Sequence, residues 1–104
     1  MIRRGELWWS EDPQLGRRPV LVLTRDAALP ALQRPLVAPL TTRVRDIPSE
    51  VVLGLADGLP RECVASFDNL QPFPRSLLVE RIGRLEGGRM LEIRRALAAA
   101  VECE

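Results

Sequence analysis

Prolines and glycines divide this sequence into short apolar segments. The chain has nine prolines and seven glycines among its 104 residues, so most of its segments are too short for a helix and suit strands. We expect strands where the segments are rich in apolar and β-branched residues, which is the case for 7–9, 19–24, 36–41, 47–53, 63–67 and 77–85. This pattern predicts one domain, residues 1–104, that is mainly β and forms a strongly bent sheet or small barrel.

Helical spacing occurs at the end of the sequence. After Gly87 and Gly88, apolar side chains recur every three or four residues and predict one packed helix over about 88–102: Met90, Ile93, Leu97 and Ala100. Earlier in the chain, Asp26 is placed to cap a short helical turn that Pro30 would end.

Two of the predicted strands carry further information. The 19–24 segment is continuously apolar, which is typical of a central strand buried on both faces. The preceding residues 10–17 are polar and contain proline and glycine, so they indicate a loop. Pro39 lies inside the 36–41 segment and has no backbone N–H to donate, so we expect an edge or a bulge there.

The charged residues limit the possible chemistry. All 15 basic residues are arginines, and histidine is absent. The lack of histidine excludes Ser-His-Asp and Cys-His nucleophile systems and His-ligated zinc or haem. We expect neither a metal site nor a cofactor. Arginine suits bidentate phosphate contacts, whereas the net charge of +1 argues against a polybasic binder.

The sequence gives no sign of export or of membrane insertion. The first residues lack the apolar region of a signal peptide, and the run 96–101 is far too short to span a bilayer. We therefore expect a cytoplasmic protein. Cys63 and Cys103 form no CxxC pair; we expect two reduced thiols, and one bridge between them is the alternative.

Arginines and a threonine at predicted strand ends are candidate site residues. Arg17 and Arg18 come directly before the 19–24 strand, and Thr41 ends the 36–41 strand. If that strand continues, Thr41, Arg43 and Arg45 share one side-chain direction, which suits a phosphate and its neighbours. The alternative is a solvated arginine pair at a strand entry, a threonine that caps a strand end and two exposed arginines.

Two further pairs are candidates. Asp68 and Asn69 follow the 63–67 strand, where a carboxylate and an amide can orient a hydroxyl or bind a base edge. Alternatively they form a plain Asx turn. Trp8 and Trp9 are adjacent, so in a strand their side chains face opposite ways. We expect one to pack in the core, while the other either packs or stacks on a base.

The order of these motifs resembles that of the MazF/PemK toxins. The segments that carry the resemblance extend from near the N-terminus to the last helix: RRGELWW, DPQLGRRPVLVLTRD, LVAPLTT, VASFDNLQPF and ERIGRLEGGRMLEIRRAL. The arginine-proline strand entry, followed by RIGRL and the helix, is the most specific part. The resemblance implies a small SH3-like or CcdB-like bent-sheet barrel and an endoribonuclease that acts as the toxin of a toxin–antitoxin system.

The resemblance also implies roles for individual residues. Arg18 and Thr41 match the catalytic arginine and threonine of the family, and Asp68 matches an aspartate that acts in some PemK members. Arg17 lies where such enzymes contact RNA, and Asn69 replaces a frequent glutamine. With the candidates above, the expected RNA-binding residues are Arg17, Thr42, Arg43, Asn69 and Trp9.

The implied reaction uses a nucleophile of the RNA itself and no metal. Family members cut single-stranded RNA without a metal, by attack of the ribose 2′-OH on the adjacent phosphate, which leaves a 2′,3′-cyclic phosphate and a 5′-OH. DNA lacks this hydroxyl and should stay intact. The resemblance further implies a homodimer and a cognate MazE-like antitoxin whose acidic tail covers the RNA groove.

Some residues depart from the family pattern. The loop before Arg17 is short and lacks the glutamate that commonly follows its glycine, and Ser66 stands where PemK-type members have an arginine. The general acid, the general base and the cut sequence therefore stay open. Two alternatives remain: a non-enzymatic gyrase-binding toxin like CcdB, although this chain lacks the Trp-containing end of CcdB, and a catalytically weak family member.

Overall fold

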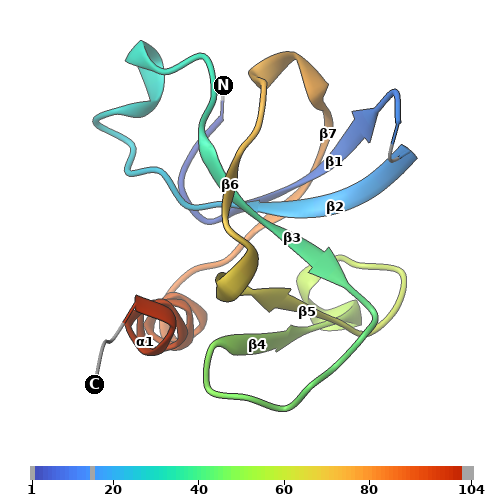
Figure 1. Ribbon diagram of the computed structural model, residues 1–104, viewed down its shortest axis with the longest axis vertical. Helices are drawn as coiled ribbons and strands as arrows, with labels where there is room; N and C mark the ends of the chain where they lie inside the picture. Colours follow the sequence, from blue (N-terminus) through green and yellow to red (C-terminus); the bar gives the residue numbers. More distant parts are fainter. Residues whose placement is uncertain (1, 15, 102–104) are drawn as a thin grey trace.

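Antiparallel strands and one C-terminal helix form the computed structural model, which describes residues 2–14 and 16–101 (Figure 1). The strands are β1 (Glu6–Asp12), β2 (Gly16–Val22), β3 (Leu36–Thr41), β4 (Glu50–Leu53), β5 (Cys63–Ser66), β6 (Gln71–Pro72) and β7 (Leu78–Arg84). The helix is α1 (Gly88–Val101), and short 3-10 turns are η1 (Leu29–Ala31), η2 (Leu55–Asp57), η3 (Phe67–Asn69) and η4 (Arg75–Leu77). The strand order is β4-β5-β3-β2-β1-β7, and β6 pairs with β3. The predicted mainly-β fold with a C-terminal helix is confirmed.

The first two strands form a long hairpin where the sequence predicted a loop. β1 and β2 pair from Leu7–Leu21 to Asp12–Gly16, so most of the 10–17 segment is strand. The prediction was wrong because it required apolar side chains, whereas a ladder is made by backbone groups. Ser10 is fully buried in this hairpin, and its hydroxyl donates to the Arg18 carbonyl oxygen at 2.9 Å.

The other predicted elements differ mainly at their ends. The 36–41 strand is confirmed, the 63–67 and 77–85 strands each lose end residues to 3-10 turns or loops, and the 47–53 strand is only 50–53. The helix runs over Gly88–Val101, and the expected last residue, Glu102, lies outside the described residues. The two-residue strand β6 was not predicted.

The helical turn near Asp26 is present, but its expected cap and end are wrong. The Leu29 N–H donates to the Arg25 carbonyl oxygen at 3.2 Å, and the chain continues into η1, whose N-cap is Ala28 and which no side chain caps. Asp26 instead accepts a hydrogen bond from the Arg4 N–H at 2.7 Å. Pro30 lies at the start of η1 rather than ending it, in keeping with the preference of proline for a first turn.

Pro39 lies in an interior strand whose pairing with β2 has no register shift, so neither the expected edge nor the expected bulge is present there. One side of β3 pairs with β2. On its other side, Leu36 and Val37 pair with β6, whereas Leu40 and Thr41 pair with β5. Pro39 falls between these two partner strands, where the ladder is interrupted and a missing N–H costs little.

β2 separates two apolar clusters, which confirms that it is buried on both faces. Leu21 belongs to a cluster that extends to Ile93 and Ala96 of α1. Val20 and Val22 belong to a second cluster, with Phe73 and Leu78 among its members. Figure 1 shows α1 beside β4 and β5. The helix packs towards the end of the hairpin at which Leu7 pairs with Leu21, and it lies away from the other end, at which Asp12 pairs with Gly16.

Three further findings concern residues 2–14 and 16–101. None of their helices is long and apolar enough to cross a membrane. They contain no group of three or more Cys, Asp or Glu side chains arranged to hold a metal ion. Cys63 is a free, buried thiol; burial, assisted by the charges of Asp57 and Glu62, raises its pKa. Cys103 lies outside the described residues.

Candidate functional site

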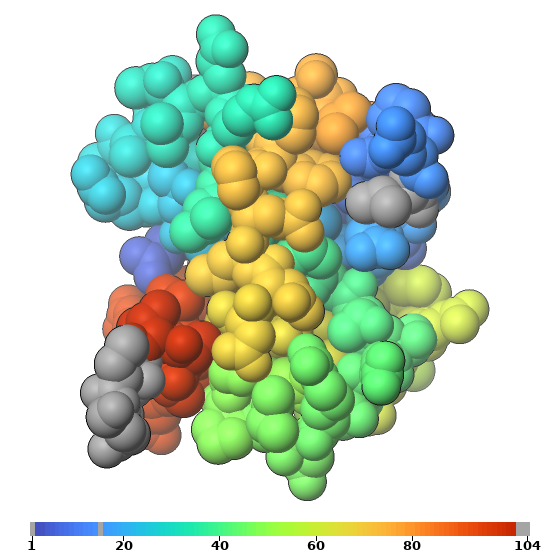
Figure 2. Space-filling view, in the orientation of Figure 1, coloured from blue at the N-terminus to red at the C-terminus, as the bar shows by residue number. Residues whose placement is uncertain are grey.

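An open groove forms where β2, the end of β3 and η3 meet. Its volume is about 760 Å³, and it brings together the three predicted catalytic residues, Arg18, Thr41 and Asp68. Two predicted RNA-binding residues, Arg43 and Asn69, also line it. We call it the Arg18 groove; its remaining lining residues are Pro39, Leu40, Arg45, Leu70 and Gln71. On the face shown in Figure 2, the yellow segment after β5 lies against the green loop after β3.

The sheet register explains why Arg18 and Thr41 meet. Val20 of β2 pairs with Pro39 of β3 in an antiparallel ladder. Two residues further along each strand, on the same face, this register leads to Arg18 and Thr41. η3 follows β5, the strand that pairs with the end of β3, and so brings Asp68 to the same place. The site is therefore built from β2, the end of β3 and the 3-10 turn that follows β5.

A second pocket lies on the other side of the β3 end. It has a volume of about 270 Å³ and contains the other predicted RNA-binding residues, Trp9, Arg17 and Thr42. Leu40 and Thr41 line both this pocket and the Arg18 groove, so the two hollows adjoin. We call it the Trp9 pocket; its other lining residues are Pro19, Leu59, Pro60, Arg61 and Cys63.

Arg17 is held above Trp9 by two carboxylates. Its guanidinium carbon lies 4.9 Å from the centre of the Trp9 ring. Its two terminal nitrogens donate to Glu80 at 2.7 Å and to Glu11 at 2.8 Å. The hydrogen bond to Glu80, with that to Glu11 and both charges, raises the pKa of Arg17. Trp8 packs on the second apolar cluster, on the opposite side from Trp9, as the alternation predicted. Its indole N–H donates to Glu6.

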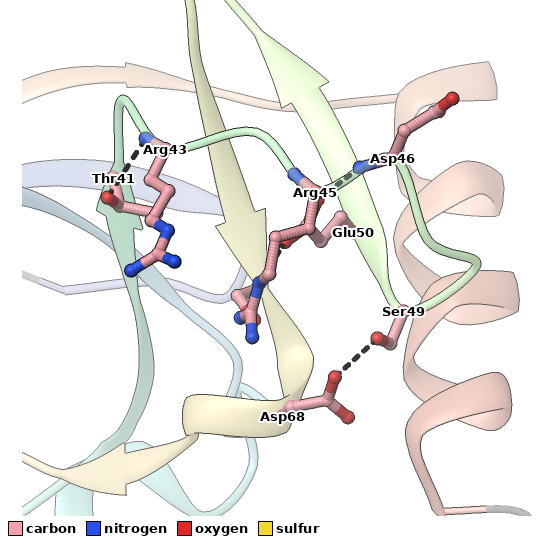
Figure 3. A network of polar contacts seen from close by, with 8 residues as sticks. Thr41, Arg43, Arg45, Asp46, Ser49, Glu50 and Asp68 are labelled. Atoms are coloured by element: carbon pink, nitrogen blue, oxygen red, sulfur yellow. Dashed lines mark hydrogen bonds and ion pairs between the residues drawn. The ribbon is translucent and has the colours of Figure 1, made fainter.

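Arg18 presents a free guanidinium to the groove. The side chain is half-buried, and within the described part of the chain no group is paired with its guanidinium. The Thr41 hydroxyl oxygen accepts the Arg43 N–H at 3.2 Å (Figure 3). Since this bond uses a lone pair, the hydroxyl proton of Thr41 remains available to donate to a ligand.

Asp68 is fixed by a serine that sequence reasoning missed. Ser49, which is buried, donates its hydroxyl to Asp68 Oδ2 at 2.6 Å, as Figure 3 shows. The pair is 19 positions apart in the sequence, and no local pattern marks it. With Oδ2 held, Oδ1 is left for a ligand.

Arg45 and Gln71 also line the groove. The sequence suggested Arg45 as a phosphate-binding candidate beside Thr41 and Arg43 on the assumption that the strand continues, and it did not indicate Gln71. β3 ends at Thr41, and the following residues form a loop. Both arginines reach the groove, although not for the reason given.

Comparison with known proteins gives consistent matches. Residues 3–101 match the family described as the PemK-like, MazF-like toxin of type II toxin–antitoxin systems. The sequence is 50% identical over 101 residues to "Probable endoribonuclease MazF5" of Mycobacterium tuberculosis, which covers 96% of this chain and 93% of the relative. The structure is similar to that of "Mycobacterium tuberculosis toxin MazF-mt6", with a TM-score of 0.82, 34% identity and coverage of 91% and 94% of the two chains. It is also similar to an "Endoribonuclease in complex with its cognate antitoxin from Mycobacterial species", with a TM-score of 0.84, 27% identity and coverage of 97% and 95%.

Proposed function

This chain belongs to the PemK/MazF family of type II toxin endoribonucleases, and we propose that it cuts single-stranded RNA in the Arg18 groove by attack of a ribose 2′-OH on the adjacent phosphate. The observation that carries the proposal is the meeting, in one open groove, of a hydroxyl, a carboxylate and a guanidinium that has no ion-pair partner among the described residues. The nucleophile comes from the substrate itself, so the protein has to bind, orient and stabilise charge. The CcdB-like alternative is not favoured, because the relatives are named endoribonucleases.

Arg18 has the main electrostatic role in this proposal. Its guanidinium binds the scissile phosphate and stabilises the extra negative charge of the transition state. Arginine keeps its proton at neutral pH, so charge stabilisation rather than proton donation is its function. Because Arg18 has no ion-pair partner within the described residues, a phosphate need not displace one.

Thr41 acts on an oxygen of the scissile phosphate, and Asp68 acts on the attacking 2′-OH. Thr41 accepts the Arg43 N–H and donates its own hydroxyl to a phosphate oxygen. Asp68, held through Oδ2 by Ser49, uses Oδ1 to orient or deprotonate the 2′-OH. The direction of each hydrogen bond is thus set by contacts that are already made without substrate.

The remaining predicted residues bind the flanking RNA. Arg43 and Asn69 contact the strand within the Arg18 groove, and Thr42 contacts it at the border of the Trp9 pocket. A flanking base enters this pocket and stacks on Trp9. Arg17 joins by exchanging Glu80 or Glu11 for a phosphate, because both carboxylates are exposed and their ion pairs are weak.

The proposal extends to protein partners and location. Structures of similar proteins include a complex with a cognate antitoxin and MazE-MazF complexes of Deinococcus radiodurans. A groove lined by three arginines, Arg18, Arg43 and Arg45, suits the acidic flexible tail of such an antitoxin. The active form in this proposal is a homodimer that acts on mRNA in the cytoplasm.

Cleavage of a mixed-sequence RNA in the presence of EDTA tests the proposal. The wild type should give products with 2′,3′-cyclic phosphate and 5′-OH ends, and leave DNA intact. Arg18→Ala and Thr41→Ala should each lower the rate about 10²–10³-fold, whereas Arg94→Ala, an exposed change on α1, should not. Equal rates for all the variants would refute the site, and a slow wild type would indicate a catalytically weak family member.

A further inference from the structure

Two buried side chains hold the guanidinium of Arg45 at the wall of the Arg18 groove. The Arg45 Nε donates to Glu50 Oε2 at 3.2 Å, and Nη2 donates to Ser66 Oγ at 3.3 Å. The Glu50 side chain is 2% exposed and Ser66 is 1% exposed, whereas the Arg45 side chain is 45% exposed. One edge of the guanidinium is therefore fixed, and much of the group is open to the solvent.

Glu50 also binds the backbone of the chain segment that carries Arg45. Its Oε1 accepts the backbone N–H groups of Arg45 at 2.9 Å and of Asp46 at 3.1 Å. Asp46 has a φ of 55°, a left-handed conformation that is unfavourable for most residues but accessible to aspartate. The buried carboxylate thus stabilises the left-handed backbone conformation directly after Arg45, and Figure 3 shows both residues grouped around Glu50.

The contact between Glu50 and Arg45 serves to orient the guanidinium for a ligand rather than to neutralise its charge. Burial of a carboxylate carries a solvation cost comparable with what its pairing returns, so Glu50 adds little net stability. What it provides is orientation. A guanidinium has five N–H groups; Glu50 and Ser66 take two, which leaves three for a ligand. Arg43, on the same groove, has no such anchor within the described residues and must lose side-chain freedom on binding.

We propose that Arg45 is a preorganised anion-binding residue that takes a second phosphate of the RNA backbone in the Arg18 groove, and that Glu50 is its positioning residue. The inference rests on the proposed function, because it concerns the same groove and the same substrate. Arg18 holds the phosphate that is cut, and Arg45 holds a neighbouring one and fixes the register of the strand. A preoriented fork discriminates between phosphate positions better than a mobile side chain does.

The test measures binding and cleavage separately. Binding is measured by fluorescence anisotropy with an RNA that is 2′-O-methylated throughout and so cannot be cut; cleavage is measured as the single-turnover rate at saturating enzyme. Arg45→Ala should raise the Kd about tenfold to a hundredfold, the value of hydrogen bonds to a charged group. It should also lower the slope of log K against log salt by about 0.7, the change for one phosphate contact on a single strand. The saturated rate should fall by less than the affinity.

Two more variants separate orientation from charge. Glu50→Gln keeps the Arg45 charge but loosens its anchor, so the Kd should rise severalfold while the salt slope stays that of the wild type. Arg45→Gln combined with Glu50→Gln leaves no buried carboxylate unpaired, so it should fold even if Arg45→Ala does not, and should bind as weakly. Arg94→Ala, which also removes one charge but lies on α1, is the control and should bind like the wild type.

The outcomes are distinguishable. Arg45 variants that bind like Arg94→Ala would overturn the phosphate contact, and Glu50→Gln with wild-type affinity would overturn the positioning role. An uncut natural RNA with normal binding of the methylated RNA would refute the proposed cleavage and leave the Arg45 contact standing. A wild type that neither cuts nor binds RNA would overturn both.

Discussion

Replacement of Glu6 by glutamine should destabilise the protein markedly. Glu6 is 4% exposed, and its Oε1 accepts the Arg3 N–H at 2.7 Å and the Trp8 indole N–H at 3.0 Å. Its Oε2 accepts from Arg81 Nε at 2.7 Å. In Glu6→Gln the amide oxygen can keep the first two bonds, but the amide nitrogen then faces the donor of Arg81. The loss is about 2 kcal/mol, one hydrogen bond to a charged group, since the half-exposed Arg81 regains water.

The loss of stability in Glu6→Gln should depend on pH. Burial alone would raise the pKa of Glu6, but the hydrogen bonds from Trp8, Arg81 and the Arg3 N–H outweigh it, so the pKa lies below its ordinary value. A carboxylate with a lowered folded pKa stabilises above its unfolded pKa, about 4.3, and this stability is lost as the pH falls through the folded value. The difference between wild type and Glu6→Gln should therefore be full at pH 7 and shrink towards pH 3.

Urea denaturation at the two pH values measures the effect. A loss of about 2 kcal/mol corresponds to a fall of roughly 10 °C in Tm for a domain of this size. The matched control is Glu80→Gln on β7, whose side chain is 65% exposed and pairs with Arg17. An exposed pair of this kind contributes about 0–1 kcal/mol. Equal stability of the two variants at pH 7, or a difference that does not shrink in acid, would refute the reasoning.

Three further changes test other parts of the structure. Asp57→Asn should lower the free energy of unfolding by about 1–3 kcal/mol at pH 7 and by less in acid, as measured by urea denaturation. The reason is that the hydrogen bonds from Arg89 and from the Gly54 N–H outweigh burial and lower the pKa of Asp57. Gly58→Ala should lower Tm by the equivalent of about 1–2 kcal/mol, since Gly58 has a φ of +94° and a Cβ there would lie 3.2 Å from Ile82 Cγ2. Ser49→Ala should lower the single-turnover cleavage rate about tenfold, the value of one hydrogen bond to Asp68, with little change in RNA affinity.

The local patterns predicted the fold well where apolar side chains define an element. The 36–41 strand and the C-terminal helix follow directly from apolar spacing. The hairpin was missed because its outer half is polar and is held by backbone pairing and by the buried hydroxyl of Ser10. The prediction for Pro39 was wrong because propensity rules consider only neighbours along the chain. In the structure, Pro39 lies at a gap between two partner strands of β3, where no N–H is needed. Such gaps depend on topology, which a local pattern does not contain.

The three residues predicted to be catalytic line one groove in the structure, and their catalytic role stays a prediction. Arg18, Thr41 and Asp68 each end or precede an apolar run in the sequence, and the order β5-β3-β2 brings the three side chains to the same groove. The contacts that support the site could not be predicted in this way. Ser49 lies 19 positions from Asp68, and Arg45 lies 21 positions from Ser66, so neither contact leaves a periodic signal in the sequence.

The start of β4 supports both walls of the groove. Ser49 ends a turn, Glu50 begins β4, and the side chains of these two adjacent residues reach different elements. Ser49 donates to Asp68 on η3, and Glu50 accepts from Arg45 on the loop after β3. β4 is itself tied to the helix, because Arg89 of α1 donates to the Val52 carbonyl oxygen at 2.8 Å. The candidate general base and the second anion-binding residue thus share one support, and a one-residue shift of β4 would displace both at once.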